Sequence, residues 1–126
     1  MKSIIYSKDA PSPIGPYSQA VKAGNMLYVS GQIAIDPVTE QLIEGNIEDE
    51  TSRVMQNIEA LLAASGFSFA DIVKTSIFLS DMKHFAVVNG IYDSFFQSDF
   101  PARETVAVLG LPKNVNVEIS VIAYKL

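Results

Sequence analysis

The segment 115–124 constrains the fold of this chain more than any other part of its sequence. Its residues alternate between two sets, Val117, Ile119, Val121 and Ala123 on one side, and Glu118, Ser120, Ile122 and Tyr124 on the other. Such alternation is typical of a β-strand, and here the second set is also largely apolar. Both faces of the sheet that holds this strand therefore need cover. A face left open would favour self-association.

The other segments predict five more strands and two helices. The predicted strands are residues 3–6, 17–22, 26–30, 71–79, 104–109 and 115–124, and the predicted helices are 47–65 and 81–97, the second capped by Ser80 or Asp81. Two helices cannot cover both faces of a six-stranded sheet, so we expect them to pack on one face. At 126 residues the chain predicts a single α+β domain over 1–126.

The two helices follow from apolar periodicity and from their end signals. The apolar residues that share a face are Ile47, Val54, Ile58, Leu61 and Leu62 in the first helix and Phe85, Val88, Ile91, Tyr92 and Phe95 in the second. Asp49 and Glu50 lie in the first turn of the first helix, where the helix dipole favours negative charge. Gly66 supplies the stop signal.

Charge and residue content argue against several classes of function. Nine scattered Lys and Arg residues stand against 14 Asp and Glu residues, so nucleic acid is not an expected partner. The chain has no Cys, which excludes disulfides and thiolate metal sites. Neither a signal peptide nor a membrane-spanning run is visible, and we expect a cytoplasmic protein.

Common catalytic motifs are also missing. The only histidine, His84, has no acidic cluster beside it, which disfavours both a metal site and a Ser-His-Asp triad. It is interpreted as an exposed helical residue. The glycines match neither a phosphate loop nor a dinucleotide-binding fingerprint. We therefore expect no metal and no cofactor.

Two charged residues in apolar strand contexts are the main candidates for a site. The guanidinium of Arg103 suits a carboxylate or phosphate, although a salt bridge to a local acid or between subunits would also explain it. Glu118 lies mid-strand, where it needs a partner or becomes a proton-transfer group. A solvent-facing residue or an ion pair is the alternative.

Four further residues could line a site, each with a simpler interpretation. Tyr17 follows a proline-rich loop and could offer its phenol, or simply be packed. Ser30 and Gly31 end a strand, where a ligand could approach the backbone. Asn89 lies on the second helix, where a lone Asn is usually exposed. The residues alone predict a soluble α+β domain that forms oligomers, with Arg103 as its one candidate for binding an anion.

The segments that hold these residues resemble the RidA (YjgF) family in order and spacing over essentially the whole chain. The motifs are Ile14-Gly15-Pro16-Tyr17-Ser18-Gln19-Ala20, Val29-Ser30-Gly31-Gln32-Ile33, Val88-Asn89 with Tyr92, Phe100-Pro101-Ala102-Arg103, and Val117-Glu118-Ile119. The resemblance implies a chorismate-mutase-like fold with a six-stranded mixed sheet and two helices on one face. It also implies a homotrimer with clefts between subunits.

The resemblance further implies 2-iminobutanoate/2-iminopropanoate deaminase activity, the hydrolysis of imines released by pyridoxal-phosphate enzymes to 2-oxo acids and ammonia. On this basis Arg103 would clamp the substrate carboxylate, and Glu118 would orient or deprotonate the attacking water. Substrate-binding roles would fall to Tyr17, Ser30, Gly31, Asn89, Arg103 and Thr105. No cofactor and no metal is implied.

Two departures from the family pattern concern the site. Thr105 stands where many members have Cys, and Ser120 stands where a second acid often follows Glu118. We expect activity to survive with altered pocket shape or specificity. Two alternatives remain open: a non-catalytic module that binds small carboxylates and regulates a partner protein, or an endoribonuclease or translation inhibitor.

Overall fold

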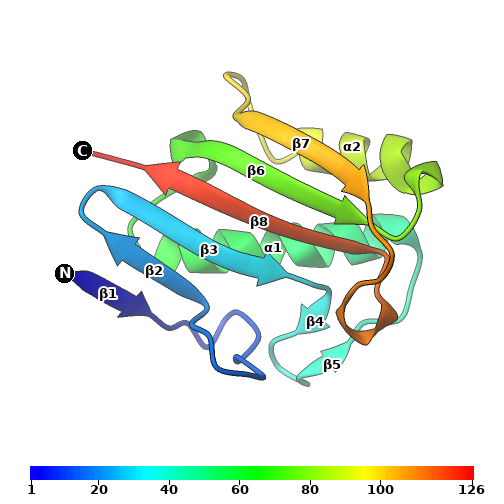
Figure 1. Ribbon diagram of the computed structural model, residues 1–126, viewed down its shortest axis with the longest axis horizontal. Helices are drawn as coiled ribbons and strands as arrows, with labels where there is room; N and C mark the ends of the chain where they lie inside the picture. Colours follow the sequence, from blue (N-terminus) through cyan, green and yellow to red (C-terminus); the bar gives the residue numbers. More distant parts are fainter.

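The computed structural model describes residues 1–126 as one six-stranded sheet, a small hairpin and two α-helices (Figure 1). The strands are β1 (Lys2–Ile5), β2 (Ala20–Ala23), β3 (Met26–Gln32), β4 (Ile35–Asp36), β5 (Gln41–Leu42), β6 (Ile72–Leu79), β7 (Ala102–Ala107) and β8 (Val117–Tyr124). The helices are α1 (Ile47–Ala64) and α2 (Phe85–Asp93). Neither helix has the length and apolarity needed to cross a bilayer.

The sheet is mixed and has the order β1-β2-β3-β8-β6-β7. All neighbours are antiparallel except β6 and β7, which run parallel. The strand β8, which the alternation in segment 115–124 predicted, lies between β3 and β6. Between Val29 and Gln32 the pairing of β3 with β8 shifts register. This irregularity falls at Ser30 and Gly31, two of the predicted site residues.

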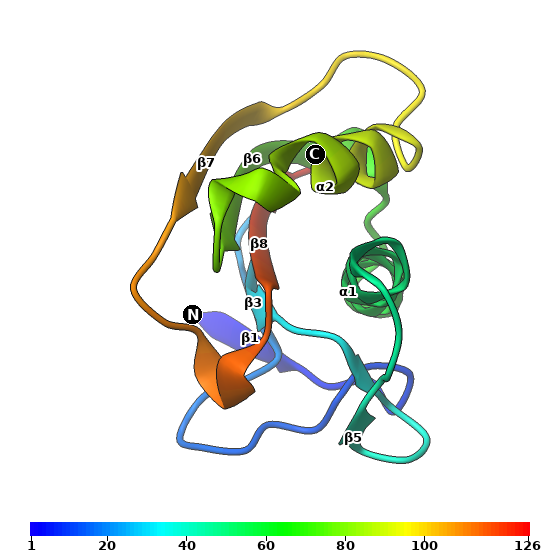
Figure 2. The same ribbon diagram turned by 90° about the vertical axis from the view of Figure 1, so that its right-hand side faces the viewer.

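Both helices pack on the same face of the sheet, which confirms the predicted layer arrangement (Figure 2). The face of α1 that carries Val54, Ile58, Leu61 and Leu62 is buried. These side chains pack in one core cluster with alternate residues of the strands, among them Leu27, Val29, Ile77, Leu79, Val117, Ile119 and Val121. The core therefore lies between the helices and one side of the sheet.

The ends of α1 follow the sequence signals. The Asn46 side chain caps the first turn by accepting a hydrogen bond from the backbone N–H of Asp49. The Glu50 carboxylate accepts bonds from the backbone N–H groups of Asn116 and Val117, at 2.8 and 3.1 Å. It thereby joins the first turn of α1 to the start of β8. Gly66, with φ +78°, follows the helix in the left-handed conformation that glycine tolerates.

Several predicted boundaries are wrong. The second α-helix begins at Phe85, after the short 3₁₀ helix Met82–His84, and the strand predicted over 104–109 is Ala102–Ala107. Two further differences have a local cause. The second helix ends at Asp93, not Gln97, because the Ser94 hydroxyl binds the backbone carbonyl of Ile91 and the chain turns there. The predicted strand 17–22 begins only at Ala20. Tyr17 belongs instead to the preceding loop, where its N–H donates to the Gly15 carbonyl at 2.8 Å.

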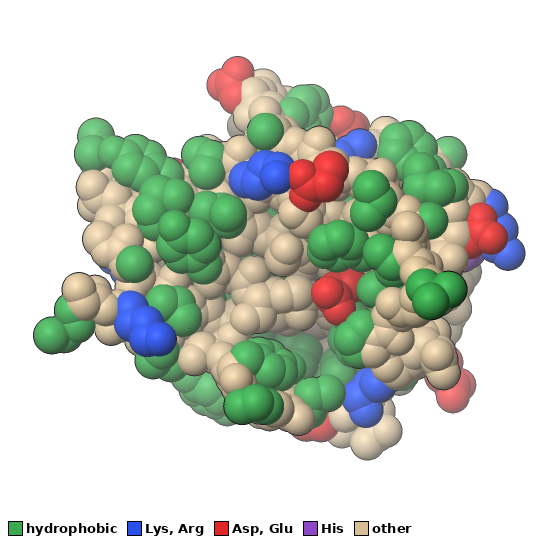
Figure 3. Space-filling view, viewed as in Figure 1, with side chains coloured by type: hydrophobic (Ala, Val, Ile, Leu, Met, Phe, Trp, Pro, Cys, Tyr) green, Lys and Arg blue, Asp and Glu red, His purple; other side chains and the backbone are tan.

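The sheet face opposite the helices is not covered by any element of the chain (Figures 2 and 3). Hydrophobic side chains gather on it in groups separated by polar surface (Figure 3). Tyr28 and Val106, which are 47% and 42% exposed, lie on this face, because they pair in register with Ile122 and Phe78. The predicted apolar character holds only in part, because Lys74 and Glu104 form an ion pair of 2.6 Å across β6 and β7.

Candidate functional site

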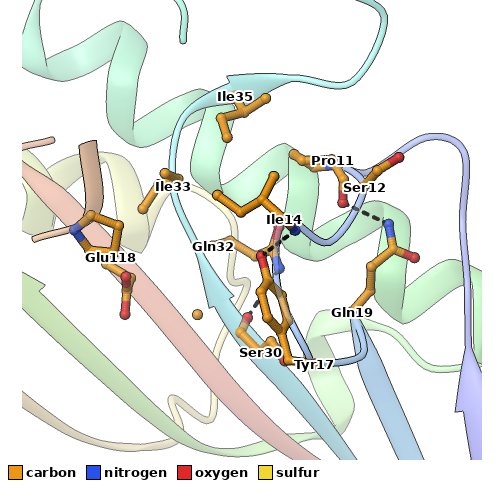
Figure 4. Close-up of a pocket in the computed structure, with 12 residues that line it drawn as sticks. Pro11, Ser12, Ile14, Tyr17, Gln19, Ser30, Gln32, Ile33, Ile35 and Glu118 are labelled. Atoms are coloured by element: carbon orange, nitrogen blue, oxygen red, sulfur yellow. Dashed lines mark hydrogen bonds between the residues drawn. The ribbon is translucent and has the colours of Figure 1, made fainter. Parts of the chain in front are cut away.

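A cavity of about 340 Å³ lies at the end of β3, beside the loop that precedes β2 (Figure 4). Its volume suits a small ligand. The residues that line it include Pro11, Ser12, Ile14, Tyr17, Gln19, Ser30, Gly31, Gln32, Ile33, Ile35, Pro112 and Glu118. Four predicted site residues, Tyr17, Ser30, Gly31 and Glu118, are thus brought together by the fold. They come from a loop, from β3 and from β8.

Glu118 is the only ionisable carboxylate in this lining. Its side chain is half-buried and takes part in no ion pair within the chain. Burial raises the pKa of this carboxyl, because desolvation disfavours its charged form. Of the two alternatives for Glu118, the ion pair is not formed within one chain. A carboxylate with a raised pKa is a stronger base, which suits proton transfer.

Gly31 explains how the Glu118 carboxylate reaches the cavity. A Cβ atom at position 31 would lie 2.6 Å from Glu118 Oε2 and 2.8 Å from its Cδ. These separations are well below van der Waals contact. The absence of a side chain at Gly31 thus lets the carboxylate lie directly against the β3 backbone, at the register shift between β3 and β8.

Tyr17 lies in the loop that forms one wall of this cavity, and the buried side chain of Gln19, which is 1% exposed, holds this loop in place. The Gln19 Nε2 group donates to the carbonyls of Ser7, Ala10 and Pro11 at 3.0, 3.2 and 2.8 Å, and its Oε1 accepts from the Ser7 N–H at 2.8 Å. One buried amide therefore replaces the backbone pairing that the prolines deny this loop. Tyr17 itself is 48% exposed.

Arg103 lines a second cavity of about 420 Å³, together with Asn89, Tyr92, Asp93, Phe100 and Pro101. Its Cζ lies 5.0 Å from the ring centroid of Tyr92 and 5.9 Å from that of Phe85. No carboxylate lies within ion-pair distance of it, so the local salt bridge weighed as an alternative is not formed within the chain. The guanidinium is held by aromatic faces, and its donors stay available for an anion.

The two cavities lie on opposite faces of the sheet. Arg103 pairs in register with Thr75, and Thr75 pairs with Val121, so these three share the face covered by the helices. Glu118 pairs with Phe78, and Phe78 pairs with Val106, a row on the uncovered face. The fold therefore does not bring Arg103 and Asn89 to Glu118 within one chain.

Three other positions complete the comparison with the sequence. Thr105 shares the Arg103 face of β7, and its hydroxyl oxygen is buried without a hydrogen-bond partner. Ser120 lies on the uncovered face, opposite Ser76 of β6. His84 ends a short 3₁₀ helix, Met82–His84, and is partly buried rather than fully exposed in a helix. No group of three or more His, Asp or Glu residues is placed to hold a metal ion.

Sequence reasoning missed two residues that support the site, Gln19 and Tyr92. Gln19 lies in one of the motifs but was given no role, because its four hydrogen bonds depend on how the loop folds back. Tyr92 was assigned to the core face of the second helix, and it is indeed 3% exposed. Its contact with Arg103 depends on the packing of α2 against β7, which no local pattern reveals.

Comparison with known proteins identifies close relatives over the whole chain. Residues 7–125 match the family described as Endoribonuclease L-PSP. A RutC family protein of Pyrococcus horikoshii is 50% identical over 125 residues, 99% of each chain. A 2-iminobutanoate/2-iminopropanoate deaminase of Dermatophagoides farinae is 48% identical over 118 residues, 94% of this chain and 92% of the relative.

Two solved structures show the same fold. A Rid family protein of Yersinia pestis, YyfA, is 48% identical with a TM-score of 0.96, and the match covers 99% of this chain and 100% of that one. E. coli TdcF with bound serine is 38% identical with a TM-score of 0.94, and the match covers 98% and 99% of the two chains.

Proposed function

The chain belongs to the endoribonuclease L-PSP family, that of RidA and YjgF, and from this premise we propose that it is a hydrolytic deaminase of 2-imino acids. Its substrates would be 2-iminobutanoate, 2-iminopropanoate and related imines, and its products 2-oxo acids and ammonia. A relative at 48% identity is named for this activity, and a relative of known structure holds an amino acid, serine.

The observation that carries this proposal is the unpaired guanidinium of Arg103. It forms no ion pair with a carboxylate of the chain, although Asp93 lines the same cavity, and aromatic rings hold it at the cavity wall. A substrate carboxylate would complete it with two parallel charge-assisted hydrogen bonds. Asn89 lines the same cavity and is available to the substrate. The unpartnered hydroxyl of Thr105 lies on the same face of β7.

Glu118 supplies the proton chemistry. Its carboxylate, with a pKa raised by burial, would take a proton from a water molecule as the oxygen attacks the imine carbon. The C–O bond forms as the C=N π bond breaks, and the nitrogen takes up the proton from Glu118. In the resulting carbinolamine the hydroxyl proton passes to the nitrogen by way of Glu118, the C–N bond breaks as the C=O bond forms, and the products are the 2-oxo acid and ammonia. Holding water and imine together contributes by proximity as well.

These two groups can act on one substrate only if they come from different copies of the chain. Arg103 and Glu118 lie on opposite faces of one sheet, and the Glu118 face is uncovered and partly apolar. We therefore propose a homotrimer in which each cleft combines Arg103 of one copy with Glu118 of the next. A measured solution mass of three chains supports this assembly, whereas a monomer that is fully active contradicts it.

A coupled assay tests the activity. Threonine dehydratase generates the imine, semicarbazide traps whatever is not hydrolysed, and release of 2-oxobutanoate is followed with and without the protein. We expect substoichiometric protein to lower trapping, and Arg103→Ala to abolish the effect. Lys8→Ala, which removes one exposed positive charge outside both cavities, is the matched control.

The two remaining alternatives give different results in the same experiment. A carboxylate-binding module would bind 2-oxobutanoate through Arg103 without any turnover. If the protein is an endoribonuclease, the purified wild type cleaves RNA and an identically purified Arg103→Ala protein does not. A folded wild-type protein that leaves trapping unchanged across the imines of several amino acids would refute the deaminase proposal.

A further inference from the structure

The ring of Tyr92 lies directly against the guanidinium of Arg103. Its centroid is 5.0 Å from Arg103 Cζ, within the range of a cation–π contact. Tyr92 is 3% exposed although it lines the Arg103 cavity. Tyr92 therefore belongs to the hydrophobic core cluster and contacts Arg103 at the same time.

Two contacts fix the position of the Tyr92 ring, one with β6 and one with Phe96. The Tyr92 hydroxyl donates a hydrogen bond to Thr75 Oγ1 at 2.9 Å, and Thr75 is fully buried. The ring of Phe96 lies 4.7 Å from the Tyr92 ring, and Phe96 in turn contacts Phe69 and Phe100 at 5.5 and 5.8 Å. Tyr92 is thus held by β6 and by an aromatic cluster, and it can move little.

We infer that Tyr92 is a positioning residue, whose anchored ring sets the plane in which Arg103 presents its donors to a carboxylate. Arg103 has a long, flexible side chain, and no acid of the chain lies within ion-pair distance of it. Thr75 is also the register partner of Arg103 on β6, so the hydroxyl anchor and the arginine start from adjacent backbone positions. This inference rests on the proposed carboxylate-binding role of Arg103.

The ionisation of Tyr92 is consistent with this role. Burial raises its pKa, and this effect outweighs the opposing influence of the Thr75 hydrogen bond and of Arg103. The phenol therefore stays neutral at physiological pH. A phenolate beside Arg103 would form an ion pair and compete with the substrate carboxylate, whereas a neutral ring holds the guanidinium without neutralising it.

The first test reads the position of Arg103 without requiring turnover. The ¹H–¹⁵N resonance of the Arg103 side-chain Nε–H reports the ring current of Tyr92. It is assigned in the full-length protein by its absence from Arg103→Lys. We expect Tyr92→Leu to move this resonance clearly. The matched control is Phe95→Leu, which removes a ring of the same cluster that contacts Phe69. It should leave the resonance unchanged.

The second test measures binding of 2-oxobutanoate, the product carboxylate, by calorimetry. We expect Tyr92→Leu to weaken binding about tenfold and Phe95→Leu less than about twofold. In an Arg103→Lys background, Tyr92→Leu should have no further effect, because the two residues act as one unit. A KM that rises about tenfold while kcat changes less would agree with lost positioning of the carboxylate.

Thr75→Val provides a variant that keeps every ring and removes only the hydroxyl anchor. It should weaken binding about threefold and move the Arg103 resonance in the same direction as Tyr92→Leu. Equal losses in Tyr92→Leu and Phe95→Leu, or an unmoved Arg103 resonance in both Tyr92→Leu and Thr75→Val, would overturn the inference. If the resonance moves in both variants but the wild-type protein shows no turnover, the proposed function is refuted and the inference stands.

Discussion

Replacing Gly31 with alanine should disable the site while leaving the fold intact. The added Cβ would stand 2.6 Å from Glu118 Oε2, about 0.8 Å short of ordinary contact. Because the clash is with the end of a side chain and not with backbone, the carboxylate can swing away. Gly31 does not occupy the left-handed region, so alanine fits its backbone conformation.

The magnitude follows from that displacement. A catalytic group misplaced by about 1 Å loses about 10²-fold in rate, so we expect kcat of Gly31→Ala to fall by about that factor. The free energy of unfolding should change by less than about 1 kcal/mol. Alanine in a strand gains roughly 0.4–1 kcal/mol from the unfolded state, and this offsets the cost of moving Glu118.

The assay is the coupled imine hydrolysis, combined with urea unfolding of the same preparations. Gly90→Ala is the matched control, because a Cβ on this exposed position of α2 meets nothing within 4 Å. It should retain wild-type kcat and gain stability of about 1 kcal/mol, as glycine-to-alanine changes in helices do. A Gly31→Ala protein with wild-type kcat would show that the Glu118 carboxylate is not needed where the structure places it.

Two further predictions concern stability. The raised pKa of Glu118 means that the folded state holds this proton more tightly than the unfolded state, so stability falls as pH rises from the unfolded pKa through the folded one. Glu118→Gln should therefore be more stable than wild type at pH 7 and equal to it at pH 4, by urea unfolding; no difference at pH 7 contradicts this. Gln19→Leu should lower the unfolding free energy by roughly 1–3 kcal/mol, because it removes four hydrogen bonds of a buried amide; an unchanged urea midpoint would argue against that anchoring role.

Local patterns were sufficient for the elements of the core. The first helix and β8 were predicted nearly to their ends, because apolar periodicity and a glycine stop act over a few residues. The end of α2 was not, because the Ser94 hydroxyl competes for the Ile91 carbonyl in a segment that remains apolar. Phe95 lies outside the helix, in an aromatic cluster with Phe69. Its apolar character is the same as that of a residue on the buried face of a helix, so the pattern does not show that the helix has ended.

The arrangement of the site depended on contacts distant in sequence. The alternation of β8 already separates Glu118 from Val117 and Ile119, but it does not say on which face Arg103 lies. That is decided by the parallel register of β6 and β7, which pairs Thr75 with Arg103. The gap that Gly31 leaves for Glu118 likewise depends on how β3 meets β8 at a register shift.

Separation of Arg103 and Glu118 on two sheet faces leads to a test that distinguishes a shared cleft from a site within one chain. Arg103→Ala and Glu118→Gln proteins, each inactive alone, are unfolded together in equal amounts and refolded. In a randomly mixed trimer, a cleft is intact when its arginine comes from a Glu118→Gln chain and its glutamate from an Arg103→Ala chain. This occurs in about one quarter of clefts, so about a quarter of wild-type activity should return. A site contained in one chain would regain nothing, because every chain in the mixture lacks one of the two groups.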